Sequence, residues 1–121
     1  MKLTRNTKQK KIIEDAISSY SSFFTADDLL KKVQKTDDSI GIATIYRFLK
    51  EKKNDDEIHS YNCRRKTVYS TQKNNHCHFI CTKCGKITHF NIKDIDFIEK
   101  NIDGKVCHFQ VDIYGLCKDC K

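Results

Sequence analysis

Proline and tryptophan are absent from this 121-residue chain, and glycine occurs only four times. A chain this poor in proline and glycine has no flexible linker and no low-complexity tract built from them. It also contains no apolar run near the ~20 residues that a membrane-spanning helix needs, so we expect no membrane partner. The basic N-terminal segment, residues 1–11, is not followed by the apolar stretch of a secretory signal, which leads us to expect a cytoplasmic protein.

What the chain does have is positive charge and cysteine. Lysine and arginine outnumber aspartate and glutamate by 23 to 16, for a formal net charge of +7, which favours a polyanionic partner such as double-stranded DNA. Apolar residues make up 38% of the chain and are spread along it, so we expect folded structure throughout. Seven cysteines without an export signal indicate a reducing compartment.

Four of the cysteines form two C-x-x-C steps, Cys81-Thr-Lys-Cys84 and Cys117-Lys-Asp-Cys120. Each step lets a tight turn aim two sulfurs at one point, and two such turns complete the tetrahedral donor set of a structural zinc ion, one per chain. Two disulfides or a redox-active motif are the alternatives. The first suits secreted chains and the second an early βαβ unit, neither of which the sequence indicates.

The first half of the chain has the pattern of a winged helix. Apolar spacing predicts three helices, over residues 8–19, from Thr25 through Val33, and over residues 42–52, the last with Ile42, Ile45 and Leu49 facing the core. Two candidate strands follow, residues 57–61 and 67–70, joined by a basic turn. In a winged helix the third helix enters the major groove and the hairpin meets the phosphate backbone.

The second half predicts a small α/β arrangement. We expect paired strands over residues 79–81 and 86–90, a helix over 93–101 and a longer strand over 106–114. The predicted class is therefore α+β, with a winged-helix DNA-binding domain at 1–73 and a zinc-clipped dimerisation and metal-sensing domain at 74–121. The second domain is too small to be stable alone, so we expect zinc and a second copy of the chain to complete it.

Several segments together resemble the ferric uptake regulator family of metal-dependent transcription regulators. The resemblance is carried by Arg5-x-Thr7-x-Gln9-Lys10, Thr25-Ala26-Asp27-Asp28-Leu29, Ile42-Ala43-Thr44-Ile45-Tyr46-Arg47, the segment from His76 to Lys86, and the segment from Tyr114 to Cys120. It implies an N-terminal operator-binding domain, a C-terminal domain that forms a homodimer, and a regulatory metal between them. The four paired cysteines match the family's structural zinc ligands.

The same resemblance assigns DNA contacts. Tyr46 and Arg47 match recognition-helix residues, and Thr44 is a short donor on the same helix. Arginine can bind guanine through two hydrogen bonds or grip a phosphate. Phosphate contacts are expected from exposed basic side chains: Lys8, Lys10, Lys11, Arg64, Arg65 and Lys66. The alternatives are that Tyr46 is half-buried core and that these charges only solvate the surface.

His76 and His78 alternate along a predicted strand, so both imidazoles point to one face and offer half of a transition-metal site. They match the family's regulatory histidines, and His89 stands where relatives usually carry an acidic ligand. Further candidate ligands are Asp96, His108 and Cys77, although a buried thiol or an exposed polar group is the simpler interpretation of each. Cys63, Cys77 and Cys107 leave a thiol-based redox response open.

The chain departs from the family at two positions. Phe23 and Phe24 stand where relatives often supply a histidine, and Ser70 stands where iron-binding relatives often have an acid. Fewer carboxylates and more imidazole favour zinc, nickel or cobalt over iron(II), although affinity order alone does not exclude iron(II). Peroxide sensing through an oxidised histidine at the Phe23 position is not expected.

We therefore predict a metal-responsive DNA-binding regulator, a repressor of metal-uptake or stress genes, without enzymatic activity. A regulatory iron(II) or zinc ion at His76, His78 and His89 is expected to bridge the two domains. A degenerate sensing site and a thiol redox regulator remain alternatives. A zinc-dependent enzyme is a rival from another class, but the sequence has no H-x-E or H-E-x-x-H step.

Overall fold

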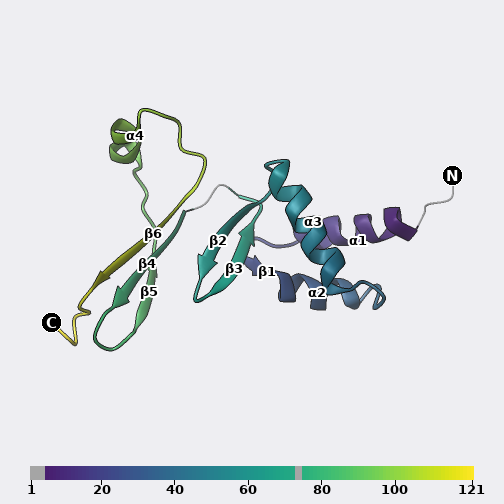
Figure 1. Ribbon diagram of the computed structural model, residues 1–121, viewed down its shortest axis with the longest axis horizontal. Helices are drawn as coiled ribbons and strands as arrows, with labels where there is room; N and C mark the ends of the chain where they lie inside the picture. The colour runs from purple at the N-terminus through teal and green to yellow at the C-terminus, as the bar shows by residue number, and fades with distance from the viewer. Residues whose placement is uncertain (1–4, 73–74) are drawn as a thin grey trace. The chain divides into compact units, whose positions relative to one another are not determined.

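In the computed structural model, which describes residues 5–72 and 75–121, the chain divides into two units, Met1–Gln72 and Lys73–Lys121 (Figure 1). Each unit combines helical structure with its own three-stranded sheet. The predicted α+β class, with a winged-helix half followed by a small α/β half, is confirmed.

Three helices precede the hairpin of the first unit: α1 (Arg5–Ser18), α2 (Ala26–Gln34) and α3 (Ile42–Asn54). Helix α1 begins three residues earlier than predicted, and α3 extends two residues further. Helix α2 begins where the sequence indicated, because Thr25 Oγ1 accepts from the Asp28 amide and Asp28 Oδ2 accepts from the Thr25 amide, both at 3.0 Å. Within the described ranges, no helix has both the length and the apolar character to cross a bilayer.

The sheet of the first unit has the order β1-β3-β2 and is antiparallel. Its strands are β1 (Phe24–Thr25), β2 (His59–Cys63) and β3 (Lys66–Ser70). Strand β2 lies two residues later than predicted, which shortens the turn to Arg64 and Arg65. The two-residue strand β1 was not predicted, because so short a segment has no periodicity of its own and is defined only by its pairing with β3.

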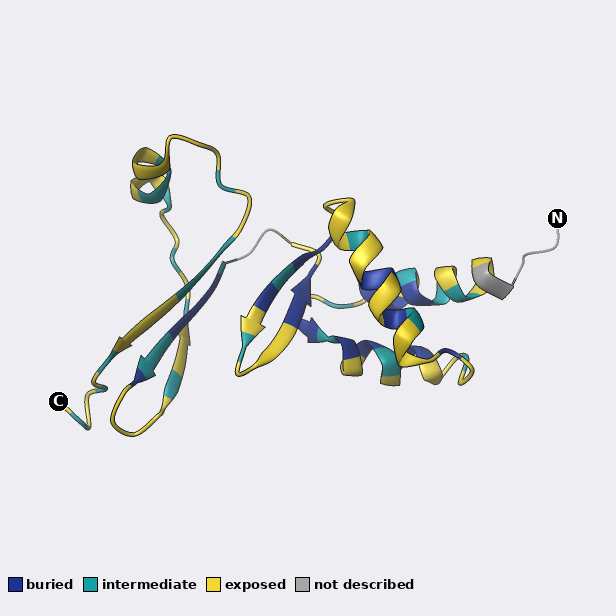
Figure 2. Cartoon of the chain, in the orientation of Figure 1, coloured by how far each residue is buried: buried dark blue, intermediate teal, exposed yellow. Residues whose placement is uncertain are grey.

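One apolar core lies between the helices and the sheet of the first unit (Figure 2). Its side chains from α1, α2 and α3 include Ile13, Leu29 and Ile45, each 0% exposed. Ile42, expected to face this core, is 38% exposed, because it occupies the first turn of α3; Phe48, at 7%, is buried instead. The core is thus built from residues at i, i+3 and i+4 spacing along α3.

The second unit is a mixed sheet with the order β5-β4-β6, where β4 pairs antiparallel with β5 and parallel with β6. Its elements are β4 (Asn75–Cys81), β5 (Ile87–Phe90), α4 (Asp96–Ile102) and β6 (Phe109–Gly115). Strand β4 begins four residues before the predicted start, α4 begins three residues late, and β6 is displaced to later residues. Helix α4 belongs to the crossover that a parallel strand pair requires.

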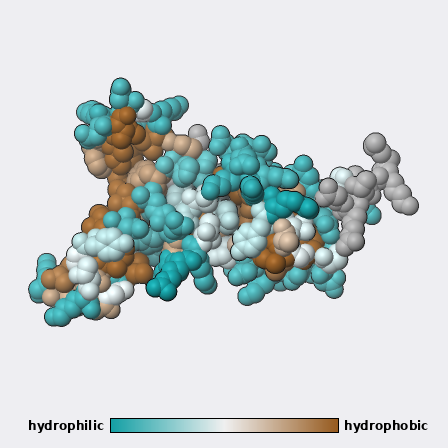
Figure 3. Space-filling model, viewed as in Figure 1, coloured by the Kyte–Doolittle hydropathy of each residue, from teal (hydrophilic) through white to brown (hydrophobic). Residues whose placement is uncertain are grey.

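Among its described residues, the second unit buries no aliphatic side chain. The side chains that it does bury there are Cys77, Cys81, His76 and His78. Several of its large apolar side chains are exposed: Phe97, Ile102, Ile113, Tyr114 and Leu116. Brown, hydrophobic atoms accordingly gather over α4 and along this sheet in the space-filling view (Figure 3).

Candidate metal centres and nucleic-acid surface

The parallel pairing of β4 with β6 brings the two C-x-x-C steps together. Its register sets Cys81 opposite Gly115, so both strands end at the same edge of the sheet and each continues into a turn (Figure 1). The first turn closes with a hydrogen bond of 2.9 Å from the Gly85 amide to the Cys81 carbonyl, and the second with one of 3.0 Å from the Lys121 amide to the Cys117 carbonyl. Gly85 has φ +78°, a left-handed conformation that favours glycine.

The four predicted zinc ligands meet at this edge. The Sγ atoms of Cys81, Cys84, Cys117 and Cys120 all lie within 4.8 Å of one another, and those of Cys84 and Cys117 are 3.8 Å apart. Tetrahedral zinc with bonds of about 2.3 Å to sulfur requires this kind of spacing between its thiolates. The donor set therefore fits a structural zinc ion, and it uses all four coordination positions.

Hydrogen bonds stabilise the thiolate form of Cys81. The amides of Cys84 and Cys117 each lie 3.5 Å from Cys81 Sγ and donate to it, which lowers the Cys81 pKa to about 6. In the same cluster, hydrogen bonding to the Cys117 thiol raises the pKa of Cys120 to about 12. Four thiolates this close repel one another unless a cation neutralises them, which is the charge that zinc supplies.

A second cluster, the three-histidine cluster, consists of His76, His78 and His89. His78 lies directly opposite His89 in the β4–β5 register, and His76 is two residues away on the same face of β4. The ring centroids are separated by 4.4 Å for His76 and His78, 4.6 Å for His78 and His89, and 5.4 Å for His76 and His89. One nitrogen from each ring lies within 4.8 Å of the others, so one divalent cation fits between the three imidazoles.

Asp112 on β6 orients the central histidine. His78 lies opposite Asp112 in the parallel register, and its Nδ1 is 2.8 Å from Asp112 Oδ1. A proton on Nδ1 leaves Nε2 with a free lone pair, and His78 Nε2 is buried without a hydrogen-bond partner among the described residues. A carboxylate behind a histidine is the usual outer partner of a metal-bound imidazole.

Sequence reasoning missed Asp112. The only signal for it was an acid in the middle of a largely apolar strand, and its distance of 34 residues from His78 hid the pairing.

Burial keeps His76 neutral. Removal from water, followed by the neighbouring His78 and His89 rings, lowers the pKa of His76 below its ordinary value. The ring is therefore uncharged at neutral pH, the form in which imidazole binds a metal.

The remaining metal candidates of this unit lie apart from the three-histidine cluster. Cys77 projects from the opposite face of β4, with Sγ 3.4 Å from Asn75 Oδ1, and burial raises its thiol pKa. Asp96 is exposed at the start of α4. The Nδ1 atom of exposed His108 is 3.3 Å from Cys107 Sγ. None of these residues belongs to the group of donor atoms around the three histidines, so each remains a prediction from the sequence.

At the two positions where this chain departs from the family pattern, the side chains contact neighbouring residues of the first unit. The Phe23 ring meets Tyr61 edge-on, with centroids 5.3 Å apart. Ser70 is 2% exposed, and its Oγ accepts a hydrogen bond of 3.1 Å from the Gln72 amide. Neither position offers an imidazole or a carboxylate.

Helix α3 presents the predicted DNA-contact residues outward. Tyr46 is 54% exposed and Arg47 is exposed, so the alternative that Tyr46 belongs to the core does not hold. Thr44 is half-buried on the same helix. Lys8, Lys10 and Lys11 are all exposed on α1, as phosphate contacts would need to be.

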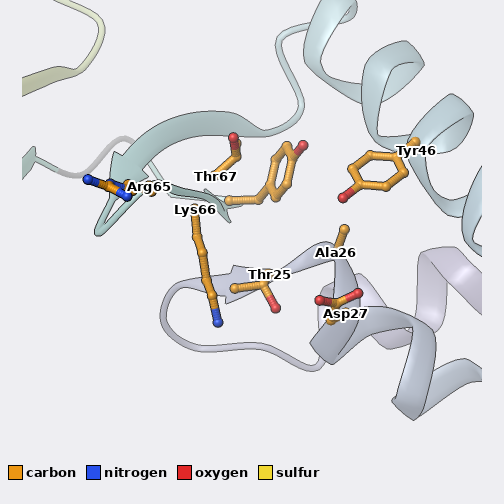
Figure 4. Close-up of a pocket in the computed structure, with 8 residues that line it drawn as sticks. Thr25, Ala26, Asp27, Tyr46, Arg65, Lys66 and Thr67 are labelled. Carbon is orange, nitrogen blue, oxygen red and sulfur yellow. The ribbon is translucent and has the colours of Figure 1, made fainter.

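The β2–β3 hairpin and α3 share a hollow of about 260 Å³. Its lining combines Tyr46 with Arg65, Lys66 and Thr67 of the hairpin and with the start of α2. In the close-up, Tyr46 turns its hydroxyl toward the hollow, while Arg65 reaches outward at the end of the hairpin (Figure 4).

A three-helix unit with a basic hairpin, joined to a sheet that carries a four-cysteine and a three-histidine cluster, defines a metal-binding transcription regulator. The chain belongs to the ferric uptake regulator family, whose family model matches residues 2–114.

One relative and two solved structures illustrate the similarity. The peroxide-responsive repressor PerR of Staphylococcus epidermidis is 32% identical over 122 residues, which cover 97% of this chain and 81% of the relative. The crystal structure of the Campylobacter jejuni peroxide stress regulator is 29% identical, with a TM-score of 0.57 and coverage of 94% of this chain and 90% of that one. The Helicobacter pylori ferric uptake regulator Fur, described with three functional metal-binding sites, shares the fold with a TM-score of 0.64 at 21% identity.

Proposed function

We propose that this protein is a homodimeric, metal-responsive repressor that binds double-stranded DNA and acts without catalysis. The observation that carries the proposal is the three-histidine cluster, in a chain of a regulator family whose third helix presents Tyr46 and Arg47 outward. His76 and His78 are buried and His89 is exposed, and one ring nitrogen from each lies within 4.8 Å of the others. A metal ion is the partner that their chemistry fits.

Two metals have separate roles in this proposal. Cys81, Cys84, Cys117 and Cys120 hold one structural zinc ion per chain, which leaves no position open for exchange. His76, His78 and His89 hold the regulatory ion, with Asp112 fixing the tautomer of His78. When bound, the regulatory ion supplies a positive charge and a fixed link between neighbouring strands.

The donor chemistry points to the kind of metal sensed. Three neutral nitrogens without a carboxylate in the first coordination sphere suit zinc, nickel or cobalt better than iron(II). The curated relatives are named as peroxide-responsive, but Phe23 in this chain packs against Tyr61 and offers no oxidisable imidazole. We therefore propose a response to the supply of a nitrogen-preferring divalent metal rather than to peroxide.

DNA binding is assigned to the first unit. Arg47 is proposed to contact a guanine edge or a phosphate, and Tyr46 a thymine methyl group, in the major groove. Thr44 adds a short donor, and Lys8, Lys10 and Lys11 neutralise phosphates.

Dimerisation is assigned to the second unit. Its exposed apolar side chains are candidates for burial against a second copy: Phe97, Ile102, Ile113, Tyr114 and Leu116. The described residues of this unit bury no aliphatic side chain that would offset their exposure.

The seven cysteines, all without disulfides among the described residues, support a reducing cytoplasm as the compartment.

The test is a DNA-binding titration at one stated ionic strength. Protein that retains one zinc per chain, but has lost its exchangeable metal, is titrated in turn with zinc, nickel, cobalt, manganese and iron(II). We expect a nitrogen-preferring ion to raise operator affinity at least about tenfold, a typical coupling between two sites. His89→Ala should abolish that increase. Thr88→Ala, a neighbouring exposed position on the other face of β5, is the matched control and should retain it.

Two results would contradict the proposal. Equal DNA affinity with and without every metal would indicate a degenerate site, and no DNA binding under any condition would remove the regulator function. Arg47→Ala sharpens the test, because it should abolish operator binding while leaving zinc content unchanged. Lys53→Ala, at the exposed end of α3, controls for loss of one positive charge.

A further inference from the structure

The tip of the β2–β3 hairpin has an unusual residue choice for its backbone. Cys63 pairs with Lys66, so the strands are joined by only two residues, Arg64 and Arg65. Both have positive φ, 49° and 66°, as the central residues of a type I′ turn must. Such turns strongly favour Asn-Gly or Gly-Gly, because a side chain in the left-handed region collides with its own backbone.

Two arginines at these positions therefore make the hairpin less stable than Asn-Gly at the same positions would. Strained backbone conformations of this kind cluster at binding and catalytic sites, so the turn is a candidate contact surface. Both arginines are exposed, and the adjacent Lys66 extends the positive charge. No acidic residue occurs between Glu57 and Asp94, so the hairpin carries no carboxylate of its own to neutralise these groups.

The tip of the hairpin and α3 lie on the same side of the first unit. The hollow beside α3 is lined both by Tyr46 and by Arg65, Lys66 and Thr67 (Figure 4). Asp27 also lines it, and this carboxylate disfavours a phosphate inside the hollow itself. The side chain of Arg65 reaches outward, past the hollow, at the end of the hairpin.

We propose that Arg64 and Arg65 enter the minor groove of the operator and read a narrow, A·T-rich tract beside the bases contacted by α3. A narrow minor groove has an enhanced negative potential that attracts arginine, and a two-residue turn is slim enough to enter it. This inference depends on the proposed function, since it requires that α3 binds DNA.

The test begins with selection of an operator from random duplexes, using protein loaded with the metal that gives the highest affinity. Duplexes are then made in which the flanking A·T pairs are replaced by G·C or by inosine·cytosine. Inosine presents the major-groove edge of guanine but lacks its minor-groove amino group, so the pair separates the two grooves.

For the unaltered protein we expect the G·C flanks to lower affinity about tenfold and the inosine flanks to restore it. The double variant R64N/R65G should melt at the same or a higher temperature, because its turn is unstrained, and should bind all three duplexes with equal, reduced affinity. The variant R64K/R65K, which keeps the charge, should lose most of the preference for A·T flanks, because the lysine ammonium is more strongly hydrated than a guanidinium and costs more to desolvate in the groove. The control K31N/K35N removes two exposed charges, one from the last turn of α2 and one from its C-cap, and should retain the preference.

Each other outcome has a definite meaning. If R64N/R65G discriminates between the flanks as the unaltered protein does, the arginines do not read them and the inference is wrong. If the unaltered protein ignores the flanks while R64N/R65G binds all duplexes more weakly, the tip only contacts phosphates and the inference is also wrong. If selection recovers no sequence at all, the proposed function fails, which is distinguishable from either result.

Discussion

The two units of this chain are stabilised in different ways. The first buries a continuous set of aliphatic and aromatic side chains from three helices and a sheet. The second, among its described residues, buries only two cysteines and two histidines, and leaves several large apolar side chains exposed (Figure 2). A domain of ~50 residues without an aliphatic core needs metal or a partner subunit to fold. The first unit is therefore self-sufficient, and the second depends on bound metal or on a partner subunit.

The largest effect is expected from removing a zinc ligand. Cys117→Ser should abolish zinc binding and unfold the second unit, because structural zinc contributes about 10–16 kcal/mol to the folding of small metal domains. Metal analysis should give far less than one zinc per chain, and sedimentation should give monomers. Cys107→Ser, an exposed thiol outside the four-cysteine cluster, is the control and should keep both zinc and dimer. A Cys117→Ser variant that dimerises without zinc would show that the second unit does not depend on metal.

A core substitution should act on the other unit. Leu29→Ala removes a side chain that is 0% exposed and should lower the free energy of unfolding of the first unit by about 3 kcal/mol. Urea denaturation followed by the tyrosines of that unit measures the loss. Zinc content should remain unchanged; a parallel loss of zinc would indicate that the two units fold as one.

Within the second unit, Asp112→Asn should weaken binding of the regulatory metal about 10–100-fold, the usual effect of removing an outer partner of a metal-bound histidine. Cobalt(II) titration, followed by its visible absorption, measures the affinity. The zinc in the four-cysteine cluster should be retained, and Asp119→Asn, an exposed acid beside Cys120, should leave cobalt affinity unchanged. Equal affinity in Asp112→Asn and the unaltered protein would remove Asp112 from the site.

The smallest effect concerns the start of α2. Thr25→Ala removes one half of the capping box and should destabilise the first unit by about 1 kcal/mol. Thermal unfolding of the first unit is the measurement, with Thr71→Ala, at an exposed position, as the control. A loss equal to that of Leu29→Ala would mean that the cap, rather than the core, dominates this unit.

Local chemistry made much of the fold predictable. Thr25 and Asp28 indicated the start of α2, and the two C-x-x-C steps indicated the cysteine cluster. Each of these patterns consists of residues only a few positions apart in the sequence. His76 and His78 were recognised by their alternation and His89 by resemblance. The sequence also indicated the hairpin and its basic turn, although the turn is shorter than the residues between the predicted strands.

What escaped prediction depends on distant pairing. Strand β1 exists only through its pairing with β3, and Asp112 meets His78 only through the parallel register of β4 and β6. The exposure of Ile42 likewise follows from where α3 begins relative to the core, which spacing along one helix does not reveal. Composition alone did not show that the second unit would lack an aliphatic core.

Amide hydrogen exchange of the full chain, with zinc bound and after its removal by a strong chelator under reducing conditions, tests the central claim most directly. We predict that the amides of β4, β5 and β6 lose their protection without zinc, while those of α1, α2 and α3 exchange as before. Protection of β4, β5 and β6 that persists in the zinc-free protein would contradict the account.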